Sequence, residues 1–224
     1  MILYTTTQKQ IATTSPGSFT FSTPIAGDYA VKLVGGGGGG GHFDAKYYGG
    51  WSNWTYAGGG SGAYFYGLVR LQANVTYIVV VGAGGANVGG QGTSGAGGDS
   101  YIAQASTRLV TAGGGSGCQC AQYLGAAYTG QGGRVTTTSS VITTYTNKTG
   151  NNGPYGVSGN GNWQYAASVY NGATQGYGSG GGGWADGDDR ASSAAGYAGY
   201  FEIIYNDYAY QGFSLYIGNC YSQI

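Results

Sequence analysis

The residues able to do acid–base or metal chemistry are few and widely separated in this sequence. The single histidine, His42, lies near Asp44, but no serine or cysteine nucleophile motif accompanies the pair. Asp186 and Asp188 offer alternate oxygen ligands of the kind used by Ca²⁺ loops, and a solvated turn is the simpler interpretation of that run. We therefore expect no catalytic residues, no metal site and no enzyme activity.

The three cysteines, Cys118, Cys120 and Cys220, admit more than one arrangement. Cys118 and Cys120 are too close in sequence for a comfortable bridge to each other, and Cys220 could pair with either, leaving one thiol over. Three cysteines with one distant histidine lack the spacing of a zinc site. We expect mainly buried free thiols. No lysine follows a glycine run, so a phosphate-binding loop is excluded and no cofactor is expected.

Composition narrows the class of protein. Glycine accounts for 50 of the 224 residues and tyrosine for 23, whereas proline occurs only three times and charged residues make up 7%. Collagen would need glycine at every third position and abundant proline. Disordered chains lack the 15% aromatic content and the β-branched runs seen here. These numbers favour an ordered, glycine-rich, non-collagenous protein.

The formal net charge is zero and no basic patch occurs, which argues against nucleic-acid binding. No apolar run approaches the roughly 18 residues of a membrane span, so membrane insertion is not expected. Residues 1–14 begin with Met1 and lack signal-peptide features, which favours synthesis in a cytosol without Sec export. The composition, in contrast, is typical of an extracellular fibre or adhesin. A virion component would satisfy both observations, because it is made in the cytosol and released by lysis.

Glycine is concentrated in tracts that follow strand-like runs. Residues 35–41 are seven consecutive glycines, and further tracts occupy residues 58–62, 82–98, 113–117 and 172–183. A left-handed polyglycine-II helix has about three residues per turn, and glycine at every third position would leave one edge bare for a neighbour. Glycines at this spacing are the expected structural glycines: Gly35, Gly38, Gly41, Gly89, Gly92, Gly95, Gly98, Gly153, Gly156 and Gly159.

Short β-branched or alternating runs predict strands throughout, and no segment has helical periodicity. Residues 77–81 form the most hydrophobic run and should lie centrally. The Thr-rich residues 134–149 predict an insertion that forms a long hairpin or a protruding strand. The expected fold is all-β, a β-sandwich or jelly-roll-like set of strands with a layer of bundled polyglycine-II helices. We expect an N-terminal arm over residues 1–16 and one domain over residues 17–224. The other expected strands cover residues 2–7, 18–22, 29–34, 64–66, 69–71, 100–105, 108–112, 200–205 and 213–217.

Three strand-to-glycine junctions carry a family resemblance. They are residues 27–34 entering 35–41, residues 77–81 entering Gly82-Ala83-Gly84-Gly85, and residues 109–112 entering 113–115. Together they resemble the glycine-rich domain of bacteriophage tail proteins and of anaplastic lymphoma kinase-type receptor ectodomains. The resemblance covers about residues 17–117 and a closing part near 178–204, and implies a polyglycine-II bundle. In phage adhesins at tail-fibre tips, such a bundle holds variable recognition loops.

Aromatic residues are the candidate binding groups, because tyrosine and tryptophan offer large, rigid, half-polar surfaces. Residues 42–57 are interpreted as an exposed aromatic loop. The alternative, to which we give equal weight, is that these rings cover the glycine bundle. The bundle has no side chains of its own to exclude water. The candidates are Tyr47, Tyr48, Trp51, Trp54, Tyr56, Trp163, Tyr165, Tyr170 and Trp184.

The sequence thus favours a non-enzymatic structural or adhesion protein at the virion surface, either a tail-fibre tip or a capsid or tail decoration. Expected partners are other virion structural proteins, in a homo- or hetero-oligomer, and a host surface glycan or protein receptor. The alternative is an extracellular structural subunit of a cellular filament or sheath, which an exposed N-terminal strand inserting into a neighbour would favour. Glycosylation of Asn53, Asn74 or Asn147 would indicate a secretory source.

Overall fold

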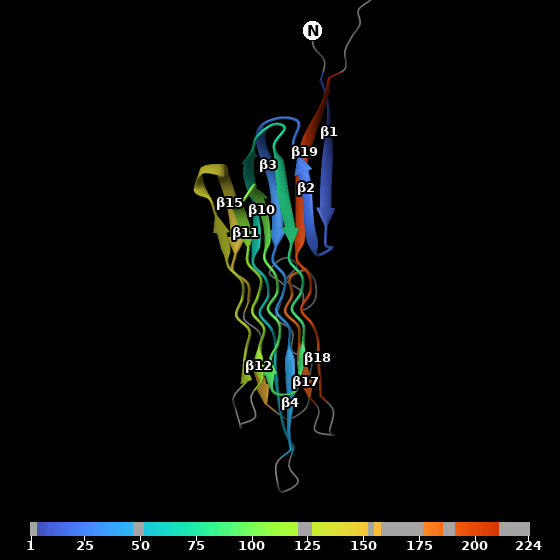
Figure 1. Cartoon of the computed structure of the whole chain (residues 1–224), viewed down its shortest axis with the longest axis vertical. Coiled ribbons are helices and arrows are strands. Elements are labelled where there is room, and N and C mark those ends of the chain that lie inside the picture. The colour runs from blue at the N-terminus through green and yellow to red at the C-terminus, as the bar shows by residue number, and fades with distance from the viewer. Residues whose placement is uncertain are drawn as a thin grey trace, which may run out of the picture.

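The molecule is long and has two β-rich ends joined by extended glycine-rich segments. The computed structural model describes residues 4–46, 52–120, 127–151, 155–157, 177–185 and 191–210. Within these ranges the chain is all-β, with one 3₁₀ turn and no α-helix. Two larger sheets lie at one end, and short strand pairs that we call the tip lie at the other (Figure 1).

The first sheet has five antiparallel strands in the order β1-β19-β3-β6-β15. β19 pairs with β1 along the whole of β1, from Tyr4↔Tyr210 to Thr13↔Phe201. The expected N-terminal strand therefore exists and pairs within its own chain. The bounds are β1 (Tyr4–Thr13), β3 (Gly27–Val34), β6 (Tyr64–Leu71), β15 (Ile142–Lys148) and β19 (Tyr200–Tyr210).

The second sheet also has five antiparallel strands, in the order β14-β11-β10-β7-β2. β7 is flanked by β10 and β2, so the most hydrophobic run of the sequence is an interior strand. The two runs expected at residues 64–66 and 69–71 are one continuous strand, β6, of the first sheet. The bounds are β2 (Gly17–Ser22), β7 (Thr76–Val81), β10 (Ser100–Gln104), β11 (Thr107–Ala112) and β14 (Val135–Thr137).

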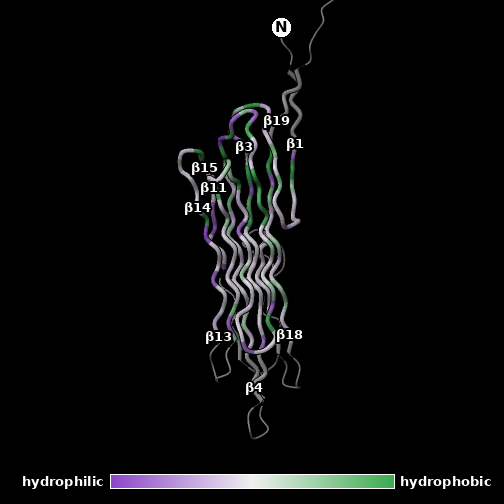
Figure 2. The backbone as a smooth tube through the Cα atoms, viewed as in Figure 1, coloured by the Kyte–Doolittle hydropathy of each residue, from purple (hydrophilic) through white to green (hydrophobic). Residues whose placement is uncertain are grey.

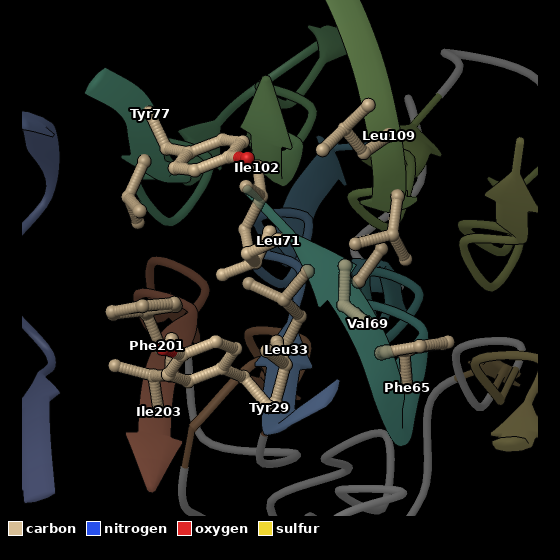
Figure 3. Close-up of a cluster of buried hydrophobic side chains, with 14 of the residues drawn as sticks. Tyr29, Leu33, Phe65, Val69, Leu71, Tyr77, Ile102, Leu109, Phe201 and Ile203 are labelled. Atoms are coloured by element: carbon tan, nitrogen blue, oxygen red, sulfur yellow. The ribbon is translucent and has the colours of Figure 1, made fainter. Parts of the chain in front are cut away.

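One hydrophobic core lies between these two sheets, which makes this end a β-sandwich. Alternate residues of each strand face inward, as in β3, where Val31 and Leu33 are fully buried and Lys32 between them is not. Figure 3 shows Leu33, Phe65 and Ile203 of the first sheet with Tyr77 and Ile102 of the second. Each such side chain contributes about 1.5–3 kcal/mol by burial.

The Thr-rich residues 134–149 do not form the predicted hairpin. β14 joins the second sheet through β11, whereas β15 joins the first sheet through β6. The 3₁₀ turn η1 (Ser139–Val141) links them, with Val141 and Ile142 partly buried against the core. The segment crosses from sheet to sheet and closes one flank of the sandwich, because Val141 and Ile142 pack at the crossing while the rest of β15 is exposed.

Beyond the sandwich, the glycine-rich segments run side by side along the long axis (Figure 2). Segment 35–40 lies among them, and each of its N–H groups donates to another segment at 2.8–3.0 Å. The acceptors repeat every three residues. Residues 35 and 38 donate to segment 60–63, residues 36 and 39 to segment 95–98, and residues 37 and 40 to segment 194–197.

The carbonyls of the same segment accept from three further segments with the same repeat. The donors are the N–H groups of Gly115 and Cys118, of Gly85 and Val88, and of Gly181, at 2.7–3.4 Å. Residues 35–41 are all buried although they carry no side chains. Their burial comes from the surrounding backbone segments, which satisfy the polar groups that burial would otherwise leave unpaired.

The tract over residues 82–98 turns back on itself near Gly90. β8 (Val88–Gly89) and β9 (Gly92–Thr93) flank Gly90, whose φ of +105° suits glycine. The returning limb bonds the outgoing one, with the Gly95 N–H 2.7 Å from the Ala86 carbonyl oxygen. The period-three spacing of Gly89, Gly92, Gly95 and Gly98 therefore spans a turn, with Gly89 before it and the other three after it.

The tip consists of short strands. β4 (Gly41–Lys46) pairs antiparallel with β5 (Ser52–Ala57), from Gly41↔Ala57 to Lys46↔Ser52, which corrects the prediction of one loop over residues 42–57. β8 and β16 (Tyr155–Val157) flank this pair. The remaining tip strands are β12 (Gln119–Cys120), β13 (Ala127–Tyr128), β17 (Gly183–Ala185) and β18 (Ala191–Ser193).

Candidate functional site: the tip and its glycine support

The glycines beneath the tip are required by close backbone contact. A Cβ added to Gly35 or Gly38 would overlap the carbonyl oxygens of Gly113 or Ser116. A Cβ on Gly95 would lie 2.7 Å from the Ala86 nitrogen. These distances are shorter than any real carbon contact, so only glycine allows the segments to approach this closely.

The other expected structural glycines have different surroundings. A Cβ on Gly98 would lie 3.1 Å from the Ala83 nitrogen, and one on Gly89 would lie 3.1 Å from the His42 ring. Gly92 has φ +153° at the turn. Gly156 pairs with Tyr56 in β16 and β5, and Gly153 and Gly159 lie outside the described residues.

The aromatic candidates are only partly placed. Tyr56 is 6% exposed, so at this position the structure agrees with the alternative of a covering ring and not with an exposed binding residue. Trp54 belongs to β5 and Trp184 to β17, and these two strands lie against each other at the tip. The remaining candidates lie outside the described residues: Tyr47, Tyr48, Trp51, Trp163, Tyr165 and Tyr170.

Two thiols lie where the glycine-rich segments meet the tip. Cys118 and Cys120 are free and buried, as expected, and form a small cluster with Ala57. A Cβ on Gly41 would lie 2.9 Å from both sulfur atoms, so this glycine makes room for the thiols. Cys220 lies outside the described residues.

Hydrogen bonding shifts the pKa values of the two thiols in opposite directions. The Cys120 thiol and the Ser94 hydroxyl, 3.4 Å from the Cys118 sulfur, lower the pKa of Cys118 to about 7 against the opposing effect of burial. The same thiol–thiol bond, together with burial, raises the pKa of Cys120. Cys118 is therefore the more acidic thiol of the pair, and Cys120 is the less acidic one.

A polar cluster around Ser193 ties three tip strands together. The Ser193 hydroxyl donates to the Val88 carbonyl at 3.0 Å and lies 3.1 Å from Nδ1 of His42. Asn87 Nδ2 donates to both oxygens of Ser193, at 2.9 and 3.1 Å. Burial lowers the pKa of His42. With the Ser193 proton on the Val88 carbonyl, the serine oxygen is left as an acceptor, which matches the His42 tautomer that carries its proton on Nδ1.

Sequence reasoning did not single out Ser193, Asn87 or Ser94. These residues are far apart in the chain and belong to no motif, so no sequence signal could have brought them together. Among the described residues, no group of three or more His, Cys, Asp or Glu side chains is placed to hold a metal ion. Asp186 and Asp188 lie outside those residues. No helix in the described part of the chain is long and apolar enough to cross a membrane.

The fold and its glycine contacts agree with the family comparison. The glycine-rich domain model matches residues 13–212, from the end of β1 through the sandwich and the tip to just beyond β19. The chain belongs to this glycine-rich domain family, and the match extends across residues 118–175, where sequence inspection found no likeness. No curated protein matches the chain.

Proposed function

We propose that the hydrogen-bonded glycine-rich segments are polyglycine-II helices, and that the protein is a non-enzymatic structural or adhesion protein of the virion surface. The observation that carries the proposal is the three-residue repeat of donors and acceptors along segment 35–40. Polyglycine-II has about three residues per turn and bonds only to neighbouring chains. Backbone angles are compatible, because the described glycines with positive φ are only Gly17, Gly90, Gly92 and Gly178.

The outer ends of β1 and β19 give the molecule a direction. The first residues of β1 and the last residues of β19 pair with each other at the sandwich end, away from the tip (Figure 1). A protein attached to a larger particle through its sandwich end would present the tip outward. This arrangement suits a tail-fibre tip or a tail or capsid decoration.

The glycine-rich support would reduce the conformational entropy that is lost when the tip binds a partner. Its backbone groups are bonded between segments, so the ends of those segments are held in fixed positions. Loops mounted on fixed ends lose less conformational entropy when they bind a partner. The aromatic residues between β4 and β5, among them Trp51, are then the proposed contacts with a host glycan or protein receptor.

Binding of the full chain to glycan arrays and to candidate host cells tests the adhesion role. We expect binding that falls about tenfold or more in the Trp51→Ala/Trp54→Ala variant, as for aromatic hot spots. Tyr145→Ala is the matched control, because Tyr145 is an exposed aromatic residue of β15 in the sandwich. Equal loss in both variants would argue against a binding tip.

Labelling of native particles in electron microscopy tests the location independently. We expect label at the distal end of a fibre or on the virion surface. Absence of the protein from virions would overturn the viral assignment. We make no proposal for the filament subunit, because β1, the strand that would insert into a neighbour, is paired with β19 in its own chain.

A further inference from the structure

β2 is an edge strand with an unprotected backbone edge. It bonds to β7 on one side, with Phe19 opposite Val79 and Phe21 opposite Tyr77. In the described part of the chain no strand pairs with its other side. Soluble proteins usually protect such edges with charged residues or proline inside the strand. β2 contains neither, whereas the edge strands of the first sheet, β1 and β15, carry Lys9 and Lys148.

The same flank of the sandwich exposes side chains that face the core. Phe19 lies opposite the buried Val79 and so points to the inner face of its sheet, yet it is 40% exposed. Ile11 of β1, opposite the buried Ile203, is 42% exposed. The other flank is closed by η1 and by the partly buried Val141. The β2 flank therefore leaves apolar surface of the core uncovered.

The sequence of β2 is its own complement in an antiparallel pair. Residues 18–22 read Ser-Phe-Thr-Phe-Ser in both directions. Antiparallel pairing of two copies about Thr20 would place Ser18 opposite Ser22, Phe19 opposite Phe21, and Thr20 opposite itself. Core-facing rings would meet rings and outward hydroxyls would meet hydroxyls, as cross-strand pairing favours. No charge opposes this register, and the net charge of the chain is zero.

We propose that β2 is a homodimer interface, in which β2 pairs with β2 of a second copy about a two-fold axis through Thr20. The second sheets of the two copies then form one continuous sheet, and Phe19 becomes covered. A two-fold axis uses the same patch on both copies and closes the assembly, so both exposed edges are removed in one contact. This surface is separate from the tip and does not depend on what the tip binds.

Molar mass in solution, measured on the full chain by size-exclusion chromatography with light scattering, tests the interface. We expect a dimer for the unaltered chain and monomers for Thr20→Lys and for Thr20→Glu, because like charges then face each other at the axis. Mixing the two variants should restore a dimer that contains one copy of each. Thr136→Lys and Thr136→Glu are matched controls, since Thr136 is exposed on β14, the opposite edge strand of the same sheet.

A cysteine variant tests the register. Residues at the axis face themselves, so Thr20→Cys should form a disulfide-linked dimer on mild oxidation, and Thr136→Cys should not. Circular dichroism confirms that each variant is folded. A monomeric unaltered chain, a dimer that survives Thr20→Lys, or loss of the dimer in the Thr136 variants would each overturn the proposal.

Discussion

The N–H of Gly38 donates to the carbonyl oxygen of Gly60 at 2.8 Å, joining two glycine tracts that belong to different strand connections. The Gly38 carbonyl in turn accepts from the Gly181 N–H at 2.7 Å. One residue without a side chain thus links three segments of the chain. The stability of the whole middle region depends on contacts of this kind, because the segments have almost no apolar side chains to bury (Figure 2).

Gly38→Ala should therefore destabilise the protein strongly. The added methyl group would overlap the Ser116 carbonyl and force the segments apart, at a cost of about 3 kcal/mol or more. Urea unfolding measures the effect. Gly27→Ala is the control, because its Cβ would meet only the Tyr29 ring at 3.9 Å. Equal stability of the two variants would show that close backbone approach is not required.

Lys32→Met should destabilise the first sheet by about 3 kcal/mol, since breaking a buried ion pair leaves its partner uncompensated. Glu202 is only 5% exposed and accepts from Lys32 Nζ at 2.7 Å, Gln10 Nε2 at 2.7 Å and Tyr200 Oη at 2.9 Å. Thermal unfolding checks the loss. The double variant Lys32→Met/Glu202→Met should recover part of it, because the unpaired carboxylate is then absent.

Stability should fall in acid partly through Glu202. Burial raises its pKa, but the hydrogen bonds from Lys32, Tyr200 and Gln10 and the charge of Lys32 outweigh burial, so the pKa lies below its ordinary value. A lowered folded-state pKa gives stability that is present above the unfolded-state pKa and is lost as the pH falls through the folded one. Denaturation at about pH 7 and about pH 3 should show a smaller acid loss for Glu202→Gln. An unchanged loss would contradict this assignment.

The thiols of Cys118 and Cys120 should be inaccessible to reagents in the folded protein. They are 0% and 1% exposed and lie where the glycine-rich segments meet the tip. In a Cys220→Ser background, Ellman's reagent should detect no thiol in buffer and both thiols in urea. Rapid reaction of both thiols in buffer would mean that this junction opens readily.

Ser193→Ala should loosen the tip while leaving the sandwich intact. It removes the bond to the Val88 carbonyl and the hydroxyl oxygen that faces Nδ1 of His42 and Nδ2 of Asn87, a loss of about 1–3 kcal/mol locally. Hydrogen exchange should rise in β4, β8 and β18 and stay unchanged in β7. Ser192→Ala, next along β18, is the matched control, and an equal rise there would contradict the role of Ser193.

Much of the sandwich follows from the sequence. Residues 29–34 and the hydrophobic run 77–81 were expected as strands, and the structure forms β3 and β7 there. Of the two forms expected for residues 134–149, the hairpin was wrong, because a threonine-rich strand has the same sequence pattern whichever sheet it joins. The aromatic loop expected over residues 42–57 was wrong, because β4 and β5 pair there. The number of aromatic residues in a segment does not indicate whether its two halves will pair.

The sequence by itself determined that the protein is all-β and rich in glycine tracts that follow strands. Only the tertiary structure decided which tracts meet: that Gly38 bonds to Gly60 and Gly181, that residues 82–98 turn back at Gly90, and that Ser193 reaches His42. The physical reason is that glycine has no side chain with which to encode a partner. The registers of these segments are set by the strands that lead into them, whose pairing is a property of the folded chain.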